Sequence, residues 1–247
     1  MVVTRARAQA SELVRRLADL GAAVVELPVI AIEDPADGGA ALTDAADLAV
    51  QGAYAWVVVT SANAVARMVD ALAGRALPAG TAWAAVGTST AKALAVRGLE
   101  AGLVPPEAVS DSLVAAFPPA RDPGGPGATV LFARAERVRN VVVPGLEAKG
   151  WRVDEVVAYR TVAGAVDPDA VAAARAADAV AFTSSSTVER TVDLLGVGGL
   201  PPVVVSIGPV TSAAARAAGL DVTAEAVVHT LDGLVEAVAG TLGPAPG

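Results

Sequence analysis

The sequence predicts an α/β protein built on parallel sheets that are covered by helices on both faces. Short apolar runs rich in β-branched residues alternate with Ala- and Leu-rich stretches of helical length, and several of those stretches end at a glycine. Strands buried on both faces of a sheet appear as continuous apolar runs, which is typical of parallel sheets. A third observation, an internal repeat, indicates that the same arrangement of elements occurs twice.

The predicted strands are short and apolar. They cover residues 2–3, 24–27, 56–59, 83–86, 129–132, 153–157, 179–182 and 203–207, with weaker candidates at 99–104 and 222–226. Helices are predicted over 9–20, 62–72, 90–97, 137–149, 186–195 and 211–218. In the first helix the leucines at 13, 17 and 20 fall on one face. Four of the helical stretches end where a left-handed glycine cap is expected, at Gly21, Gly98, Gly150 and Gly219.

The repeat runs along the chain in the order A, B, A′, B′. Unit A (1–32) contains Thr4-Arg5-Ala6, a helix and Gly21, and A′ (128–162) contains Ala133-Arg134-Ala135, a helix and Gly150. Unit B (53–117) and unit B′ (178–240) share a hydroxyl-rich turn after one strand and a glycine turn after the next. Because the glycine spacings agree as well as the composition, we interpret the match as a duplication and not as chance similarity.

Two polar breaks separate these units. Residues 33–39 and 163–169 are predicted to be linkers or hinges, because both contain Gly, Pro and Asp. The Pro- and Gly-rich residues 118–127 form a looser joint between B and A′.

The composition excludes several classes of protein. The chain of 247 residues has no cysteine and one histidine, so disulfides, thiolate metal sites and histidine-based metal sites are not expected. Its net charge is −8 and no Lys/Arg block is present, which argues against nucleic acid binding. No apolar run is long enough to span a bilayer, and the first residues lack a secretory signal. We therefore expect a cytoplasmic protein that does not bind membranes.

Four strand-to-helix turns are candidate binding sites for an anion. Small hydroxyl residues or glycine follow an apolar strand in each, at residues 60–63, 86–90, 183–186 and 207–211. In open α/β sheets ligands bind at the carboxyl ends of strands, and a helix N-terminus offers unpaired N–H groups and partial positive charge. N-capping alone explains any one of these turns. Four of them in paired positions favour an anion-binding cleft.

A few side chains are candidates for chemistry or charge recognition. Arg5 and Arg134 follow equivalent strands and could grip a carboxylate, although a solvated charge at a helix start is the alternative; the remaining arginines of these segments, Arg7, Arg137 and Arg139, read as solvated charges. Tyr159 ends a strand beside the second linker, and its phenol could donate a proton to a departing hydroxyl. We interpret Tyr54 as structural and His229 as a surface or capping residue that precedes a helix start at residues 230–233.

The combined pattern resembles the uroporphyrinogen-III synthase family from residue 2 to about residue 238. The matching pieces are Val3-Thr4-Arg5 with Gly21 and Pro28, Thr60-Ser61-Ala62-Asn63-Ala64-Val65, Val86-Gly87-Thr88 with Thr90-Ala91, Arg134 with Gly150, Val157-Ala158-Tyr159-Arg160, Phe182-Thr183-Ser184-Ser185, and Ile207-Gly208 with Thr211. Their order and spacing carry the resemblance, and no single piece does. Members usually have a longer first strand; here the strand is short or the true start lies upstream.

This resemblance implies two flavodoxin-like, parallel-sheet α/β domains joined by a two-stranded linker. Domain 1 would be discontinuous, with residues 1–33 plus 165–247, and domain 2 would be inserted as residues 38–160. The linkers would lie at about 33–39 and 160–169 and would act as a hinge that closes on the substrate. The repeat fits this pairing, because each domain then holds one A-type and one B-type unit.

The activity implied is that of a cofactor-free cyclising lyase. The family closes hydroxymethylbilane, loses its hydroxyl as water and inverts the last pyrrole to give uroporphyrinogen III, largely by orienting the substrate. Tyr159 matches the family tyrosine that assists departure of the hydroxyl, and we expect a monomer with a transient contact to the bilane-forming enzyme upstream. The expected substrate-binding residues are Thr4, Arg5, Thr60, Ser61, Ala62, Asn63, Gly87, Thr88, Thr90, Arg134, Thr183, Ser184, Ser185, Gly208, Pro209 and Thr211.

Two other functions fit parts of the pattern. A non-catalytic two-lobed protein that binds a small anionic ligand would have the same hinge and cleft. A flavodoxin-like flavin protein could use the turn at residues 183–186 to hold a phosphate, but aromatic residues that would cover a flavin are scarce near it. Neither Gly-x-Gly-x-x-Gly, a P-loop nor Gly-x-Ser-x-Gly is present.

Overall fold

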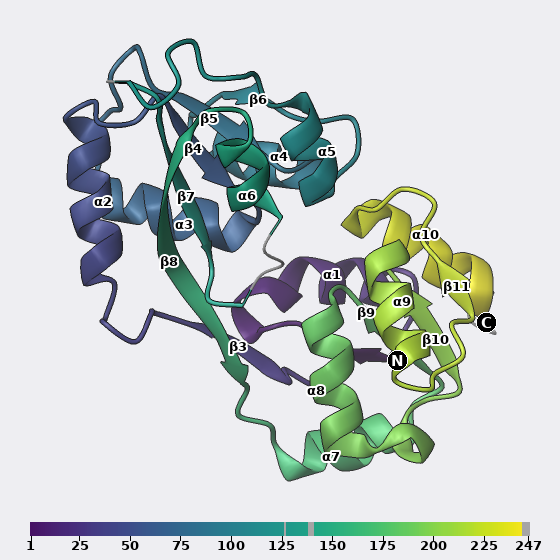
Figure 1. The fold of residues 1–247 in the computed structure, drawn as a ribbon. Coiled ribbons are helices and arrows are strands. Elements are labelled where there is room, and N and C mark those ends of the chain that lie inside the picture. Colours follow the sequence, from purple (N-terminus) through teal and green to yellow (C-terminus); the bar gives the residue numbers. More distant parts are fainter. Residues whose placement is uncertain (126, 138–140, 244–247) are drawn as a thin grey trace. The chain divides into compact units, whose positions relative to one another are not determined.

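The chain folds into two compact α/β units. The computed structural model describes residues 1–125, 127–137 and 141–243 (Figure 1). Unit 1 comprises Met1–Ala31 and Val162–Gly247, and unit 2 comprises Ile32–Thr161.

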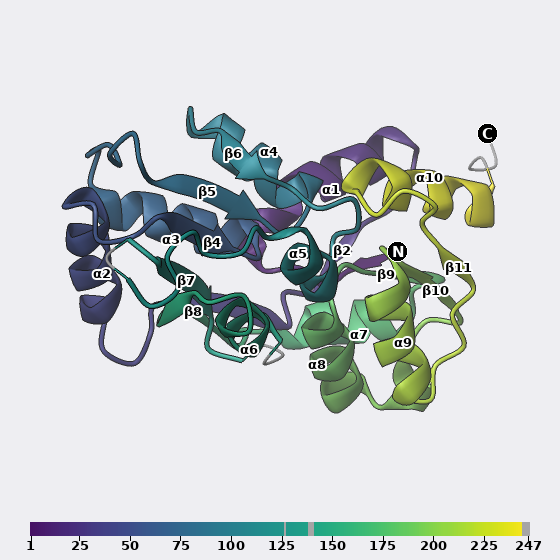
Figure 2. The ribbon, with the colours of Figure 1, turned by 45° about the horizontal axis from the view of Figure 1, so that its top comes forward.

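Unit 1 contains a five-stranded parallel sheet. Its elements are β1 (Val2–Val3), α1 (Arg7–Asp19), β2 (Val25–Glu26), α7 (Pro168–Arg175), β9 (Ala179–Phe182), α8 (Ser185–Leu195), the short 3-10 helix η1 (Val197–Gly199), β10 (Val203–Ser206), α9 (Pro209–Ala217), β11 (Ala224–Glu225) and α10 (Leu231–Leu242). The strand order β11-β10-β9-β1-β2, with every pair parallel, is the flavodoxin-like order. Figure 2 shows α1 and α10 on one face of this sheet and α8 and α9 on the other.

Unit 2 repeats this topology with its halves exchanged. It contains α2 (Ala40–Val50), β4 (Trp56–Val59), α3 (Ala62–Leu72), β5 (Ala82–Ala85), α4 (Thr88–Val96), β6 (Ala101–Leu103), α5 (Ser110–Ala116), β7 (Thr129–Ala135), α6 (Val142–Glu147) and β8 (Arg152–Ala163). Its parallel strands lie in the order β8-β7-β4-β5-β6, and β3 (Ile30–Glu33) is added beside β8. If the strands of A′ (β7 and β8) are numbered before those of B (β4, β5 and β6), the strand order is the same as in unit 1. The duplication therefore extends from the sequence to the topology.

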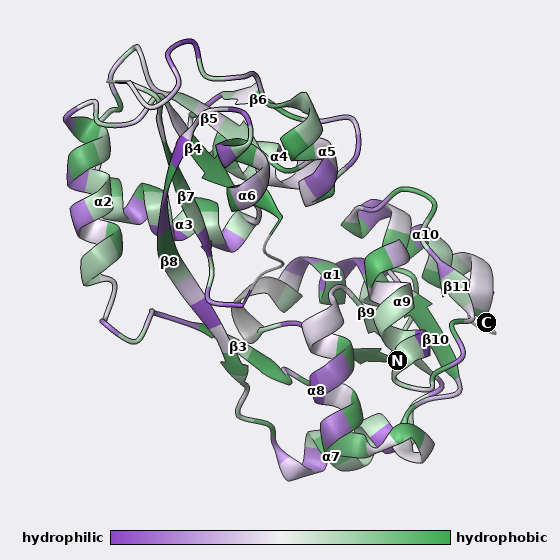
Figure 3. Cartoon of the chain, viewed as in Figure 1, coloured by the Kyte–Doolittle hydropathy of each residue, from purple (hydrophilic) through white to green (hydrophobic). Residues whose placement is uncertain are grey.

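The apolar strands supply the core on both faces of each sheet. In β4, Val57 and Val59 pack with α2, α3 and α4, whereas Val58 packs with α5 and α6 on the other face. Alternate residues of a strand point to opposite faces, so a sheet covered on both sides requires a continuous apolar run. In unit 1, Leu13 and Leu17 of α1 pack against the sheet together with α10. In Figure 3 the strands β9 and β10 are coloured as hydrophobic, and α8 carries hydrophilic patches.

Most predicted elements are present in the structure. All ten predicted strands are found, and the four predicted glycine caps have positive φ angles between 74° and 87°. The sequence interpretation missed β3, α2, α5, α7 and the full length of α10, for which it saw only a helix start. The helix predicted over 137–149 is observed as α6, and its predicted start falls partly on residues 138–140, outside the described residues.

The second predicted linker is shorter than expected. Residues 160–163 continue β8, because the β-branched run extends past Tyr159, and α7 already begins at Pro168. Asp167 caps that helix by accepting a hydrogen bond from the N–H of Asp169 at 2.9 Å. The Asp-Pro pair that we read as a linker is therefore an N-cap followed by proline at the first helical position.

Candidate functional site

The predicted turns lie at the carboxyl edges of the two sheets. In each sheet the direction of strand succession reverses between two neighbouring strands, β1 and β9 in unit 1 and β7 and β4 in unit 2. Thr4 follows β1, Thr183 follows β9, Thr60 follows β4, and Arg134 lies near the end of β7. Such reversal points are where open α/β sheets bind ligands. Each unit therefore has a candidate binding edge of its own.

The first pair of turns has the same capping geometry in both units. Ser61 caps α3 at φ −156° and ψ 156°, and Ser184 caps α8 at φ −164° and ψ 158°. The Ser61 Oγ accepts a hydrogen bond from the N–H of Ala64 at 3.1 Å, and the Ser184 Oγ accepts one from the N–H of Thr187 at 3.3 Å. N-capping is thus observed, and it leaves other N–H groups of the first helical turn without helical partners. Capping and anion binding are compatible at these turns.

The glycine turns form the second pair. Gly87 and Gly208 both have extended backbones, with φ of −175° and 168°. A Cβ atom at Gly87 would lie 2.4 Å from the Cβ of Ala108, and one at Gly208 would lie 3.0 Å from ring carbons of His229. The absent side chain therefore makes room for a following loop of the same unit. That a ligand also approaches the backbone of these glycines closely stays a prediction.

Tyr159 is held at the carboxyl edge of unit 2 by an irregularity of the sheet. Between β7 and β8 the register shifts, because Arg134 pairs with Val157 whereas Ala135 pairs with Tyr159. A bulge of this kind redirects a side chain, and bulges are frequent next to active sites. The Tyr159 hydroxyl lies 3.0 Å from the Ser61 Oγ, and the residue is only 7% exposed within the core of unit 2. The structure thus places Tyr159, the predicted proton donor, within hydrogen-bond distance of the predicted turn at residues 60–63.

The two candidate arginines are in different environments. Burial lowers the pKa of Arg5 from its usual value, and the nearby charge of Glu12 opposes that shift. By contrast, the Nε of Arg134 donates to Glu155 at 2.6 Å and its Nη1 donates to the carbonyls of Ala135 and Glu136. A carboxylate ligand would gain more at the partly desolvated Arg5 than at Arg134, where it would have to displace Glu155.

The other predicted residues divide by exposure. Thr4, Thr90 and Thr211 are buried, so their hydroxyls face the interior of their units. Ala62, Thr88 and Pro209 are exposed, and Thr60, Asn63, Thr183 and Ser185 are half-buried. Pro209 is the first residue of α9 and has no N–H group to offer. The side chain of Arg7 and the residue Arg139 lie outside the described part of the chain.

The described residues hold neither a metal-binding cluster nor a membrane-crossing helix. Among them, no group of three or more His, Asp and Glu side chains could hold a metal ion. None of the helices described is both long enough and apolar enough to cross a membrane.

These features define a class, that of proteins with two α/β units of duplicated flavodoxin-like topology. Comparison with known proteins identifies the family within this class. The model of the family described as uroporphyrinogen-III synthase HemD matches residues 11–236. A uroporphyrinogen-III synthase from Synechococcus elongatus is 35% identical over 255 residues, covering 96% of this chain and 93% of the relative.

Solved structures agree with this fold. A mutant uroporphyrinogen III synthase from the extremely thermophilic bacterium Thermus thermophilus matches with a TM-score of 0.65 at 20% identity, covering 98% of each chain. The enzyme from Helicobacter pylori 26695 matches with a TM-score of 0.59 at 15% identity, covering 89% of this chain and 93% of that one. The chain belongs to the uroporphyrinogen-III synthase family. The family, the α/β fold and the activity of a cyclising lyase in haem biosynthesis that the sequence predicted are confirmed, and the binding-protein alternative is not favoured.

Proposed function

We propose that this chain converts hydroxymethylbilane to uroporphyrinogen III with Tyr159 as the hydrogen donor to the departing hydroxyl. The observation that carries this assignment is the 3.0 Å contact between the Tyr159 hydroxyl and the Ser61 Oγ at the carboxyl edge of unit 2. The Ser61 oxygen already accepts the N–H of Ala64, and its own hydrogen is available for the phenol oxygen. The phenol hydrogen is then available for the substrate.

In the first step the bond between the terminal carbon and its hydroxyl breaks. The pyrrole nitrogen supplies the electron pair that forms the azafulvenium cation, and the leaving oxygen takes the hydrogen of Tyr159 and departs as water. The phenolate left at Tyr159 then takes the proton of the pyrrole N–H, which gives the neutral azafulvene and restores the phenol. The electrophile then attacks within the same molecule to give the spiro intermediate, which fragments and recloses with the last pyrrole inverted. A neutral phenol suits this step because it donates without bringing a charge to the site.

The acetate and propionate arms of the substrate are received by the turns of both units. We propose that the N–H groups at the starts of α3, α4, α8 and α9 bind these carboxylates, and that Arg5 binds one more. Hydrogen bonds from fixed donors hold the bilane in one conformation, and such orientation lowers the barrier by about 7–11 kcal/mol in favourable cases. The buried Thr4, Thr90 and Thr211 contribute through their backbones. We assign units 1 and 2 as the domains of the enzyme, which acts in the cytoplasm as a monomer without a cofactor.

A coupled assay with freshly generated hydroxymethylbilane tests the function. The wild-type chain should give the type-III ring, whereas a mere binder would leave only the spontaneous type-I ring. Tyr159→Phe should fold normally and turn over roughly 100-fold more slowly, as loss of a proton donor typically does. Tyr54→Phe is the matched control, because Tyr54, the other tyrosine of the sequence, precedes β4 at the amino edge of the same sheet. Equal rates for wild type and Tyr159→Phe would remove Tyr159 from the mechanism.

A further inference from the structure

His229, the single histidine of the sequence, lies against the Gly208 turn. A Cβ atom at Gly208 would be 3.0 Å from both Cγ and Cδ2 of the imidazole, and the residue is exposed. Ala108 takes the equivalent place over Gly87 in unit 2. Each of these residues follows its glycine by 21 positions in the sequence. The duplicated fold therefore brings corresponding loops onto corresponding glycines, but with different side chains.

The two glycine turns carry complementary hydrogen-bond donors. In unit 2 the first helical residue is Thr88, which is exposed and has both an N–H and a hydroxyl, whereas Ala108 offers no side-chain donor. In unit 1 the first helical residue is Pro209, which has no N–H, whereas His229 carries an imidazole that keeps at least one N–H in either protonation state. Each turn thus has a side-chain donor at this position, supplied by Thr88 in unit 2 and by His229 in unit 1.

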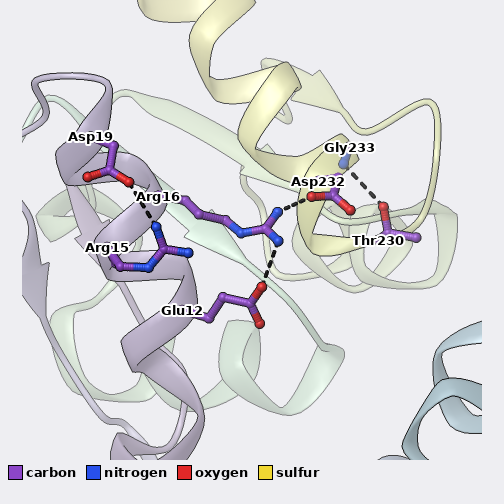
Figure 4. Close-up of polar contacts among 7 residues, drawn as sticks. All are labelled: Glu12, Arg15, Arg16, Asp19, Thr230, Asp232 and Gly233. Carbon is purple, nitrogen blue, oxygen red and sulfur yellow. Dashed lines mark hydrogen bonds and ion pairs between the residues drawn. The ribbon is translucent and has the colours of Figure 1, made fainter. Parts of the chain in front are cut away.

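The loop that carries His229 is anchored at both ends. At its start, the N–H of Ala226 donates to the carbonyl of Ser206 at 2.9 Å. At its end, the Thr230 Oγ1 accepts the N–H of Gly233 at 3.2 Å and so caps α10. Figure 4 shows this cap beside Asp232, which pairs with an arginine of α1. A fixed backbone that exposes its side chains costs little conformational entropy when it binds a ligand.

We propose that His229 is a substrate-binding residue whose imidazole N–H binds a carboxylate arm at the Gly208 turn, in place of the donor that Pro209 lacks. This inference rests on the proposed function, because it assumes that the turn receives an arm of the bilane. The two preceding residues, Val227 and Val228, are 95% and 56% exposed and offer apolar contact to a pyrrole ring. Because unit 2 has Ala108 at this position, His229 also makes the carboxyl edges of the two units chemically different.

Steady-state kinetics with hydroxymethylbilane test the proposal. His229→Ala should raise KM about tenfold, because a hydrogen bond to a charged group is lost. The thermal midpoint of this variant should equal that of wild type, because His229 is exposed. His229→Gln keeps an N–H donor and should remain within about threefold of the wild-type KM. Asp221→Ala, which removes an exposed charge near the other end of β11, is the control and should leave KM unaltered. A KM for His229→Ala within twofold of wild type would overturn the proposal.

The donor exchange between the units gives a second test. Adding Pro209→Thr to His229→Ala copies the arrangement of unit 2, and should restore most of the lost affinity. A double variant whose KM is as high as that of His229→Ala would refute the idea that His229 replaces the donor that Pro209 lacks. Failure here is distinguishable from failure of the function, because the wild-type chain must first produce the type-III ring in the same assay.

The lone imidazole also provides a readout that is independent of turnover. In an untagged chain, its ring protons give one set of NMR signals without ambiguity. Titration with uroporphyrinogen III should shift these signals, and signals that stay unmoved at saturation would contradict the contact.

Discussion

Replacing Gly87 with alanine places a methyl group where unit 2 has no room for one. The new Cβ would lie 2.4 Å from the Cβ of Ala108 and 3.0 Å from its Cα. Carbon atoms in contact are normally 3.5–4.0 Å apart, so the loop before α5 must move by roughly 1 Å. The backbone conformation itself is not strained, because its extended φ of −175° is open to any residue. The cost therefore comes from overpacking alone.

We expect Gly87→Ala to destabilise unit 2 by about 2 kcal/mol, within the range for overpacked positions. For a unit of this size that is a fall in thermal midpoint of roughly 8 °C. Gly208→Ala should cost less than about 1 kcal/mol, because it meets the exposed ring of His229, which can rotate away. Alanine should therefore destabilise the protein more at Gly87 than at Gly208, because Gly87 faces Ala108 and Gly208 faces the side chain of His229.

Tryptophan fluorescence is the appropriate assay, because all three tryptophans, Trp56, Trp83 and Trp151, lie in unit 2. Gly87→Ala should move the fluorescence transition, and adding Ala108→Gly should return it toward wild type by opening the occupied space. A Gly87→Ala midpoint within 1 °C of wild type, or a double variant as unstable as the single one, would refute this packing argument.

Two further outcomes follow from buried polar groups. Burial, reinforced by Asp154, raises the pKa of Tyr54 from 10.0 to about 12. The folded state therefore favours the neutral phenol, and this contribution to stability is present below pH 10 and is lost as the pH rises toward 12. In urea unfolding, Tyr54→Phe should lose less stability than wild type between pH 10 and 12. Identical dependence of the unfolding free energy on pH in the two proteins would contradict the assignment. The hydroxyls of Ser206 and Ser212 lie 2.5 Å apart and fully buried in unit 1. Ser212→Ala should cost about 1–3 kcal/mol by leaving Ser206 without that partner, and by circular dichroism the double alanine variant, which copies unit 2, should be no less stable than the single one.

The elements predicted correctly are those whose signal is local. The run at residues 56–59 predicts a buried strand wherever it lies, and a glycine after a helical stretch such as Gly150 predicts a left-handed cap, which its φ of 87° confirms. The strand β3 was missed because its four residues directly precede the polar linker. The helix α2 was missed because its N-cap, Gly39, has no side-chain cap, and the only cue is the upstream Asp37, whose carboxylate accepts the N–H groups of Gly39 and Ala41.

The candidate site depends on contacts between residues that are distant in the sequence. No residue near Tyr159 in the sequence predicts the bulge opposite Arg134 or the hydrogen bond to Ser61, which lies 98 positions away. Likewise, the sequence predicts that His229 is a surface residue, and it is exposed, but its position against Gly208 depends on the fold. One signal was available: aligning the two halves pairs Ala108 with His229, a change from methyl to imidazole at equivalent positions. The repeat alone permits other pairings of its units; the pairing of A with B′ came from the family resemblance, and unit 1 of the structure has the same pairing.

The central claim is that strand-to-helix turns at the carboxyl edges of both sheets bind the carboxylate arms of the tetrapyrrole. An amide NMR titration of the wild-type chain with uroporphyrinogen III measures this directly. We predict that the largest shifts occur in the amides at residues 61–64, 88–91, 185–187 and 210–212. Shifts concentrated instead at the amino edges of the sheets, around residues 80–82 and 178–179, would contradict the account.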